Sequence, residues 1–325
     1  MDELTLKIEH LSSGFFTERG HVPAVDDVSL TIPKGRVVGI VGESGCGKSM
    51  IARSIMGLLK YPGRITGGSI RLAGRELTGL PDSQLRTIRG KEMAMIFQEP
   101  MTSLNPVVPV GKQMREALLL HESMDKKAAK AEVLQMLEHV GISEPEKRCA
   151  AYPHELSGGL RQRIMIAMAM ICRPRLLIAD EPTTALDVTI EAQILRLIRS
   201  LSRETGMSVL LISHNLGVIA QMCDTVYVMY AGKIVEQADA YTLFDSHAHP
   251  YTKGLMDSVI DLETNPRRLP AIGGVVPNLL HLPAGCAFSP RCPRASGRCL
   301  TERPELTELL PGHWCRCSDE GRDAL

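Results

Sequence analysis

Short apolar runs alternate along the chain with longer segments in which apolar residues recur every three or four positions. The runs at 37–41, 176–179 and 208–212 have the length and composition of fully buried strands. Helical spacing follows the first of these runs at 48–59 and precedes the second at 159–172. Strands that alternate with helices predict an α/β core built on a largely parallel sheet.

Two regions depart from this alternation. A long helix is predicted over 110–139, where Lys, Ala, Glu and Leu are frequent, and it forms part of a helical insert over about 99–170. After about residue 263, Pro, Gly and Cys become frequent and the periodicity fades. We therefore predict a large domain over 1–262 and a small, loop-rich C-terminal extension over 263–325.

Composition and charge limit the partners of the chain. Its 325 residues are 44% hydrophobic and 23% charged, as in a globular protein, and 37 basic residues balance 37 acidic ones. Zero net charge gives no electrostatic reason to expect binding to nucleic acid. The best apolar run, at 164–172, is far shorter than the ~20 residues of a membrane-spanning helix, and the N-terminus lacks the layout of a secretory signal. We expect a soluble, cytoplasmic protein that acts at a membrane only through a partner.

A glycine-rich segment between the predicted strand at 37–41 and the predicted helix at 48–59 fits the phosphate-binding pattern G-x-x-x-x-G-K-[ST]. Its residues are Gly42, Glu43, Ser44, Gly45, Cys46, Gly47, Lys48 and Ser49. Glycines let backbone N–H groups turn inward around phosphates, and the helix N-terminus adds its dipole. Lys48 can then reach the β- and γ-phosphates, while the Ser49 hydroxyl can ligate Mg²⁺. This pattern predicts a nucleoside triphosphatase without saying which kind.

Polar side chains at the ends of three other strands complete such a site. The strand at 176–179 ends in Asp180, which can hold Mg²⁺, and Glu181, which can orient and polarise the attacking water. Gln98 can sense the metal and the water, and His214 can contact the γ-phosphate. Taken singly, a Gln or His at a strand end is more often a solvated cap. The roles of Gln98 and His214 are therefore predicted only because the other motifs of the site are also present.

A second anion site is predicted at Leu156-Ser157-Gly158-Gly159-Leu160, which precedes the helix at 159–172. Ser157 can cap that helix, and Gly158 and Gly159 expose backbone donors at its N-terminus. Two phosphate sites on one chain suggest that two chains sandwich the nucleotide, each completing the site of the other.

In this order, these motifs resemble the nucleotide-binding subunit of ABC transporters, and the resemblance implies a P-loop NTPase cassette with a parallel-sheet core, an antiparallel β portion and a helical subdomain. It implies that Glu181 is the general base, His214 the γ-phosphate switch and Gln98 the link to the membrane subunits. Asp187 would communicate across the dimer, and Phe15 would stack on adenine, although Phe16 is its neighbour. Leu160 and Asn215 depart from the usual Gln and Asp of the family. We expect activity to survive both departures, with Asn215 weakening the local positioning of the switch histidine.

Further segments resemble the ATPases of dipeptide and oligopeptide importers. These segments are 98–106, His249-Pro250-Tyr251-Thr252 and the tail at 285–293. The resemblance implies import of a peptide from an extracytoplasmic solute-binding protein, through two transmembrane permease subunits and with a second ABC ATPase subunit. It places the chain as a peripheral protein on the cytoplasmic face of the inner membrane.

A nickel chelate, glutathione or an opine are alternative solutes by analogy. ABC ATPases of DNA repair or of ribosomes are a further alternative, disfavoured by the single cassette and the short separation of Ser49 from Ser157.

Five of the nine cysteines lie in the tail. In a reducing cytosol such a group favours a metal over disulfides, yet the spacings Cys286-x₅-Cys292-x₆-Cys299 are longer than those of short zinc knuckles. The resemblance implies a [4Fe–4S] cluster on Cys286, Cys292, Cys299 and Cys317, with Cys315 as a bystander. Zinc, or thiols without metal, remain alternatives. Nothing in the sequence places this tail near the phosphates, so a structural or redox-sensing role is expected.

Overall fold

The computed structural model describes residues 3–18, 20–98, 104–184, 187–258 and 272–318. The chain divides into two compact units. The first unit comprises residues 1–5, 33–36 and 79–210, and the second comprises residues 6–32, 37–78 and 211–325. The predicted boundary between 262 and 263 lies outside the described residues. Among those residues, no helix is both long enough and apolar enough to span a lipid bilayer.

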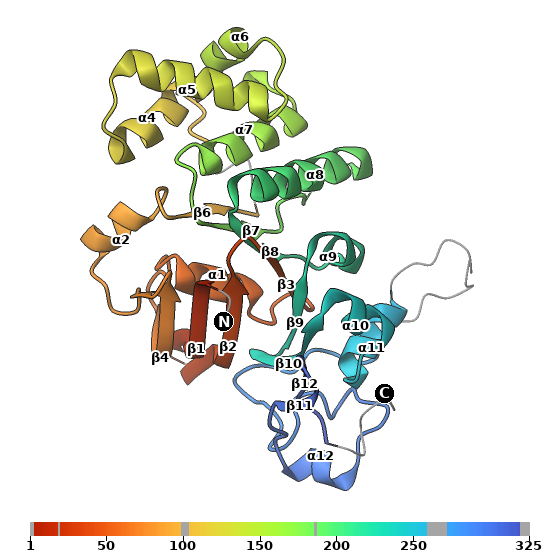
Figure 1. Ribbon diagram of the computed structural model, residues 1–325. Helices are drawn as coiled ribbons and strands as arrows, with labels where there is room; N and C mark the ends of the chain where they lie inside the picture. Colours follow the sequence, from red (N-terminus) through yellow and green to blue (C-terminus); the bar gives the residue numbers. More distant parts are fainter. Residues whose placement is uncertain (1–2, 19, 99–103, 185–186, 259–271, 319–325) are drawn as a thin grey trace. The chain divides into compact units, whose positions relative to one another are not determined.

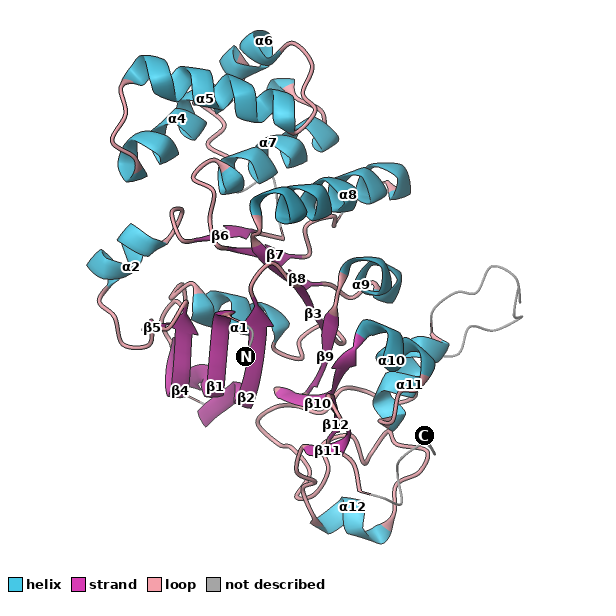
Figure 2. Ribbon diagram, viewed as in Figure 1, coloured by secondary structure: helices cyan, strands magenta, loops and turns pink. Residues whose placement is uncertain are grey.

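The first unit is mainly helical (Figures 1 and 2). Its helices are α2 (Asp82–Ile88), α4 (Val110–His121), α5 (Lys126–His139), α6 (Pro145–Ala150), the 3₁₀ helix η1 (Pro153–Glu155), α7 (Gly158–Met170) and α8 (Val188–Thr205). Strands β6 (Met93–Ile96) and β7 (Leu176–Asp180) are parallel neighbours, and β8 (Ser208–Ile212) lies beside β7 and runs into the second unit. Helices α4 to α7 lie within the range predicted as a helical insert, and they pack against one another.

The predicted helix over 110–139 is wrong as a single element, because it is interrupted between His121 and Lys126. Asp125 takes an extended conformation and its carboxylate accepts hydrogen bonds from the backbone N–H groups of Lys127 (2.8 Å) and Ala128 (2.7 Å). These bonds satisfy two of the donors that a helix leaves unpaired at its N-terminus. The cap therefore starts a new helix, α5, whose apolar residues turn inward.

In the second unit, one antiparallel sheet has the strand order β2-β1-β4-β5. Its strands are β1 (Leu4–Thr17), β2 (Gly20–Pro33), β4 (Gly63–Leu72) and β5 (Arg75–Glu76). A second set has the order β11-β12-β10-β9-β3. These strands are β3 (Val37–Val41), β9 (Thr225–Tyr230), β10 (Lys233–Asp239), β11 (Thr307–Leu310) and β12 (His313–Cys315). β3 and β9 are parallel, as expected of the core, whereas β9, β10, β12 and β11 follow one another antiparallel.

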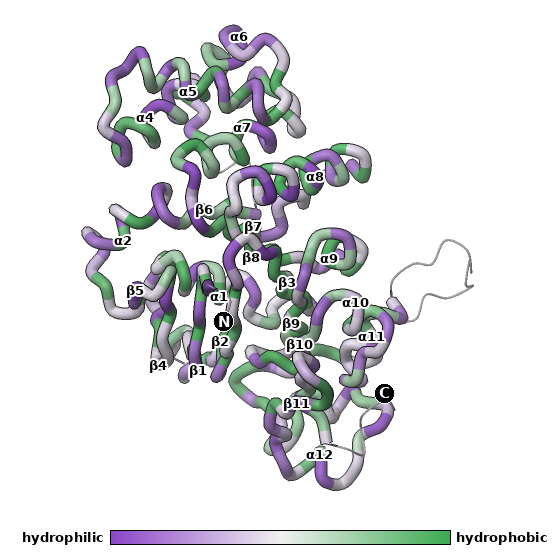
Figure 3. Tube along the Cα trace, in the orientation of Figure 1, coloured by the Kyte–Doolittle hydropathy of each residue, from purple (hydrophilic) through white to green (hydrophobic). Residues whose placement is uncertain are grey.

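The helices of the second unit are short. They are α1 (Lys48–Ile55), α9 (Leu216–Met222), α10 (Ala240–Asp245), α11 (Pro250–Asp257) and α12 (Gly297–Thr301). Every residue of β3 is buried, as its uninterrupted apolar sequence predicts, and the strand is among the hydrophobic stretches in Figure 3. α1 is shorter than the predicted 48–59, because Gly57 has a positive φ of 61° that ends the helical geometry.

The C-terminal extension contains more regular structure than its composition predicts. β12 pairs with β10, so that Trp314 lies opposite Gln237, and β11 completes a hairpin with β12. A buried carboxylate reinforces this pairing, because Glu236 of β10 accepts a 2.7 Å hydrogen bond from Nε2 of His313. The extension is thereby built into the same compact unit as the glycine-rich segment.

Candidate nucleotide-binding site

The glycine-rich segment forms a tight loop between β3 and α1 that leaves no room for side chains at two of its glycines. Gly42 has φ 152° and Gly47 has φ 110°, which L side chains rarely adopt. A Cβ atom on Gly42 would lie 2.2 Å from the carbonyl oxygen of Met229, and one on Gly47 would lie 2.2 Å from that of Ala24. The glycines are therefore required by the close approach of neighbouring backbone, and they fit the loop to wrap around a phosphate.

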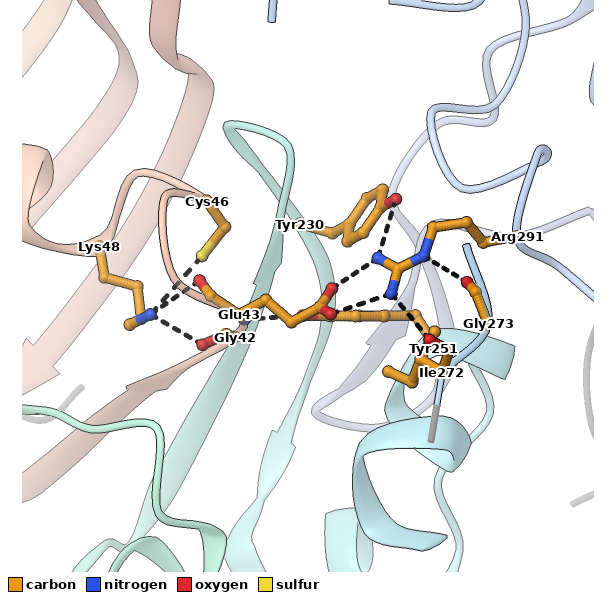
Figure 4. A network of polar contacts seen from close by, with 9 residues as sticks. All are labelled: Gly42, Glu43, Cys46, Lys48, Tyr230, Tyr251, Ile272, Gly273 and Arg291. Atoms are coloured by element: carbon orange, nitrogen blue, oxygen red, sulfur yellow. Dashed lines mark hydrogen bonds and ion pairs between the residues drawn. The ribbon is translucent and has the colours of Figure 1, made fainter. Parts of the chain in front are cut away.

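Lys48, the first residue of α1, points back into this loop (Figure 4). Its Nζ donates hydrogen bonds to the carbonyl oxygens of Gly42 (2.7 Å) and Glu43 (3.0 Å), and the side chain is 5% exposed. A buried ammonium held by neutral carbonyls keeps its positive charge available for a phosphate. Ser49 follows in the first turn of α1, where the helix dipole also favours an anion.

Cys46 lies at the centre of the loop rather than at its surface. The side chain is 1% exposed, its Sγ lies 3.9 Å from Nζ of Lys48, and burial raises the pKa of the thiol. Ser44 and Gly45 are the exposed residues of the loop. Cys46 therefore fills a small buried space and is a poor nucleophile at neutral pH.

Two residues that sequence reasoning gave no role hold the loop at Glu43. The backbone N–H of Glu43 donates a 2.9 Å hydrogen bond to the hydroxyl of Tyr251, and the carboxylate forms an ion pair with Arg291 at 2.6 Å. Both partners lie in segments already noted as typical of peptide importers. Their place in those segments was the only feature of the sequence that could have indicated a role for Tyr251 and Arg291.

The candidate adenine-stacking residue lies at the end of β1. Phe15 is half-buried and pairs with Gly63 of β4, where its ring covers the glycine. Phe16 is more exposed and is stacked on His21, with ring centroids 4.5 Å apart, and the guanidinium of Arg64 lies 3.7 Å from its ring centre. Phe16 already has partners on its ring, which leaves Phe15 as the prediction for the base-stacking residue.

In the first unit, three of the predicted polar residues meet at the end of β7. Asp180 is the last residue of this fully buried strand and is 3% exposed. Glu181 takes a left-handed conformation, with φ 48°, which is strained for a non-glycine residue. Its Oε2 accepts hydrogen bonds from Nε2 of Gln98 (2.9 Å) and from the hydroxyl of Thr184 (3.1 Å). The carboxylate at the end of β7 is thus held by two donors.

The predicted second anion site is an exposed helix N-terminus. Ser157 caps α7, its hydroxyl accepting from the backbone N–H of Leu160 at 3.4 Å, and Gly158 begins the helix. The amide of Gln162 donates to the carbonyl oxygen of Pro182, which directly follows Glu181. This bond ties the helix behind the exposed Ser157–Gly158 end to the segment that carries the candidate base.

Asp187 and Asn215 both cap helices. Asp187 accepts from the backbone N–H of Ile190 at 2.9 Å at the start of α8. Asn215 accepts from the N–H groups of Gly217 (3.0 Å) and Val218 (3.3 Å) at the start of α9, directly after the exposed His214 of the second unit. Asparagine and aspartate cap helices equally well. Asn215 therefore caps α9 as an aspartate would, which argues against the expected weaker positioning of His214.

The four predicted cluster ligands line one cavity of about 220 Å³ in the extension. They are Cys286, Cys292, Cys299 and Cys317. Burial raises the pKa of the Cys286 thiol, and the nearby Cys299 and Cys292 raise it further. Cys315 is not among the residues that line this cavity, and it packs in a small buried cluster with Ala248 and Cys317. Across the described ranges, no three His, Cys, Asp or Glu side chains lie close enough together to bind one metal ion. The four thiols thus line a cavity and do not converge on the position of a single metal ion.

Comparison with known protein families identifies both parts of the chain. Residues 25–184 match the family described as ABC transporter, and residues 235–299 match the C-terminal region of the oligopeptide/dipeptide transporter family. The oligopeptide transport ATP-binding protein OppD of Haemophilus influenzae is 49% identical over 96% of each chain. The dipeptide transport ATP-binding protein DppD of Bacillus subtilis is 50% identical over 97% of this chain and 94% of its own.

Solved structures support the same fold. A dimeric ATP-binding cassette in a post-hydrolysis state, bound to ADP and Pi, has a TM-score of 0.65 and is 25% identical over 72% of this chain and 98% of its own. The cassette cbiO1 of Clostridium perfringens, part of the ABC transporter complex cbiONQ, has a TM-score of 0.64 at 24% identity. The latter likeness concerns the fold alone.

Proposed function

The chain belongs to the ATP-binding proteins of ABC transporters, in the oligopeptide and dipeptide group, and from this premise we propose that it powers peptide import across the cytoplasmic membrane. Proteins of this family are ATPases that couple hydrolysis to transport. The peptide substrate is supported by the names of the OppD and DppD relatives and by the match of the C-terminal region. A nickel chelate, glutathione or an opine stay as alternative solutes.

The arrangement of Glu181 carries the mechanistic part of the proposal. Its carboxylate is held by Gln98 and Thr184 and is aimed by a strained backbone at the end of β7. We assign it the role of general base that takes a proton from the attacking water. Lys48 and the loop N–H groups would bind the β- and γ-phosphates, and Ser49 and Asp180 would ligate Mg²⁺. The magnesium ion would neutralise charge that develops on the phosphates.

Exposure of the capped end of α7 supports action as a dimer. Ser157 and Gly158 present backbone donors to solvent at a helix N-terminus, where an anion is favoured. In the proposed dimer this end would contact the γ-phosphate held by the partner subunit. His214 would be the γ-phosphate switch, and Asp187 would communicate across the dimer. The partner is a second ABC ATPase subunit, identical or related. Two permease subunits and an extracytoplasmic solute-binding protein complete the transporter, with this chain peripheral on the cytoplasmic face.

Substitution of the proposed base tests the mechanism. Glu181→Gln keeps the size of the side chain and should lower kcat for ATP hydrolysis by about 10² or more, while Mg-ATP still binds and dimers accumulate in size-exclusion chromatography. Glu116→Gln on the exposed face of α4 is the matched control. If Glu181→Gln hydrolyses ATP as fast as the parent, Glu181 is not the general base.

Uptake measurements test the solute. Cells that lack this chain should lose uptake of labelled di- and oligopeptides, and uptake should return with the parent chain but not with Glu181→Gln. Competition with unlabelled nickel chelate or glutathione distinguishes the alternatives. Loss of nickel or glutathione uptake, with peptide uptake intact, would replace the peptide assignment. Recovery of the chain with DNA or ribosomes rather than with membranes would point to the non-transport class.

We further propose that the thiol-lined cavity holds a [4Fe–4S] cluster. Four thiols around one space suit a cluster that takes one thiolate on each iron, whereas zinc needs ligands that converge on one point. The cluster would tie together loops that are distant in sequence. Anaerobically purified protein should contain about four iron and four sulfide per chain. Cys286→Ser should lose them and Cys315→Ser should keep them. Zinc alone would favour the alternative.

A further inference from the structure

A paired polar contact in the second unit joins the C-terminal extension to the phosphate-binding loop. The guanidinium of Arg291 meets the carboxylate of Glu43 with two bonds, of 2.6 Å and 2.9 Å (Figure 4). The Arg291 side chain is 3% exposed and that of Glu43 is 28% exposed. Paired bonds between ionised groups that are shielded from water are stronger and more directional than exposed ion pairs.

The guanidinium of Arg291 is itself held by several other contacts, so it can fix the position of the loop. Its Nε donates to the carbonyl oxygen of Gly273 at 2.8 Å, and one terminal nitrogen donates to that of Ile272 at 3.3 Å. The other terminal nitrogen lies 3.4 Å from the hydroxyl of Tyr230. A guanidinium fixed on several sides cannot follow a moving partner. Glu43 is therefore the member of the pair that is positioned.

A second contact holds the main chain of the same loop residue. The N–H of Glu43 donates to the hydroxyl of Tyr251 at 2.9 Å. Tyr251 is fully buried, and its ring packs against Tyr230, at 4.6 Å between centroids, and against Phe288 of the extension, at 5.4 Å. The loop is thus anchored to an aromatic cluster that includes Phe288 of the extension.

The anchored residue also binds the lysine, together with Gly42. The carbonyl oxygen of Glu43 accepts a hydrogen bond from Nζ of Lys48, whereas its carboxylate binds Arg291. We propose that Arg291 is a positioning residue for ATP binding, which acts through Glu43 to hold the loop in the conformation that accepts the phosphates. The C-terminal extension then contributes a residue that positions the phosphate-binding loop of the second unit. This role is separate from any binding of a metal by the extension.

The thiol-lined cavity adjoins this contact. Cys292 follows Arg291 in the chain, and both Cys292 and Phe288 line the cavity. The segment that presents the guanidinium to Glu43 is therefore the same segment that closes the cavity.

A double-mutant cycle tests the positioning role on the full-length chain. Binding of a fluorescent ATP analogue to the parent chain is measured first, because the inference rests on the loop binding ATP. Arg291→Gln should raise the Kd and the KM for ATP by about tenfold, equivalent to about 1.4 kcal/mol, with kcat at saturating ATP changed by less than about twofold. Glu43→Gln should have a similar effect, and the double variant should be no worse than either single one.

Controls separate this role from a general loss of stability. Arg294→Gln removes an exposed positive charge three residues away and should leave the Kd unchanged. Arg291→Lys should recover less than half of the affinity, because an ammonium cannot make the paired contact. Should Arg291→Gln fail to fold, Tyr251→Phe removes only the acceptor for the Glu43 N–H and should also raise the Kd. A lowered unfolding temperature with unchanged Kd, or additive effects in the cycle, would overturn the proposal.

Discussion

Replacing His249 by asparagine should remove a pH-dependent loss of stability from the second unit. The imidazole is 1% exposed and caps α11, where its Nδ1 accepts the backbone N–H of Tyr251 at 3.0 Å. Burial lowers the pKa of His249 to about 4, although the nearby carboxylate of Glu236 opposes the shift. An asparagine side chain can provide the same cap without a titrating group.

The sign and size of the effect follow from this pKa. In the unfolded chain His249 binds a proton near pH 6.5, whereas in the folded chain it remains neutral until about pH 4. Stability is therefore fully present above pH 6.5 and falls as the pH drops below it, by about 1.4 kcal/mol per unit. Between pH 6.5 and about 4.5, His249 should account for a loss of about 2–3 kcal/mol. Glu236, whose pKa is lowered, contributes only at more acidic pH.

The assay is urea unfolding followed by tryptophan fluorescence. Trp314 is the single tryptophan of the chain and lies in β12, beside β10 in the same unit as His249. The free energy of unfolding is measured at several pH values for the parent and for His249→Asn, and the readout is the difference between their slopes. The variant should lose about 2–3 kcal/mol less than the parent across this range. Parallel curves would refute the argument that burial keeps His249 neutral.

Three further substitutions have expected outcomes that the same unfolding assay, or ATP binding, can check. Asn215→Ala should cost about 1 kcal/mol because it removes the α9 cap, whereas Asn215→Asp should be neutral. Gly42→Ala should abolish ATP binding, because its Cβ would collide with the carbonyl oxygen of Met229; retained affinity would show that the loop can shift. Glu236→Leu should cost at least about 3 kcal/mol, since it orphans the buried donors of Ala248, His249 and His313; an unchanged unfolding midpoint would contradict this.

Local patterns predicted the parts of the structure that local forces determine. The loop between β3 and α1 was found because its strand, its glycines and its helix lie within 37–55 and leave distinct signals. The break before α5 was missed, although Asp125 is a good capping residue, because the helix-forming residues on both sides gave a continuous signal. A search for caps inside long helical patterns would have found it.

Pairing between distant segments could not be predicted in the same way. β12 has only three residues, so it shows no periodicity, and it is stabilised by pairing with β10 and by the contact of His313 with Glu236. The tail therefore appeared loop-rich in sequence. The expectation that nothing places it near the phosphates also fails for Arg291, which contacts the loop residue Glu43.

Glu43 shows why a motif does not by itself define a binding site. The phosphate-loop pattern leaves its position open to any residue, because the pattern describes only the glycines, the lysine and the hydroxyl that meet phosphate. In this protein its main chain and side chain are held by Tyr251 and Arg291, which lie 208 and 248 residues away. A loop of glycines has many accessible conformations, so contacts that select one of them raise affinity without touching the nucleotide. The residues that make this loop competent should therefore be sought in the C-terminal extension as well as in the motif.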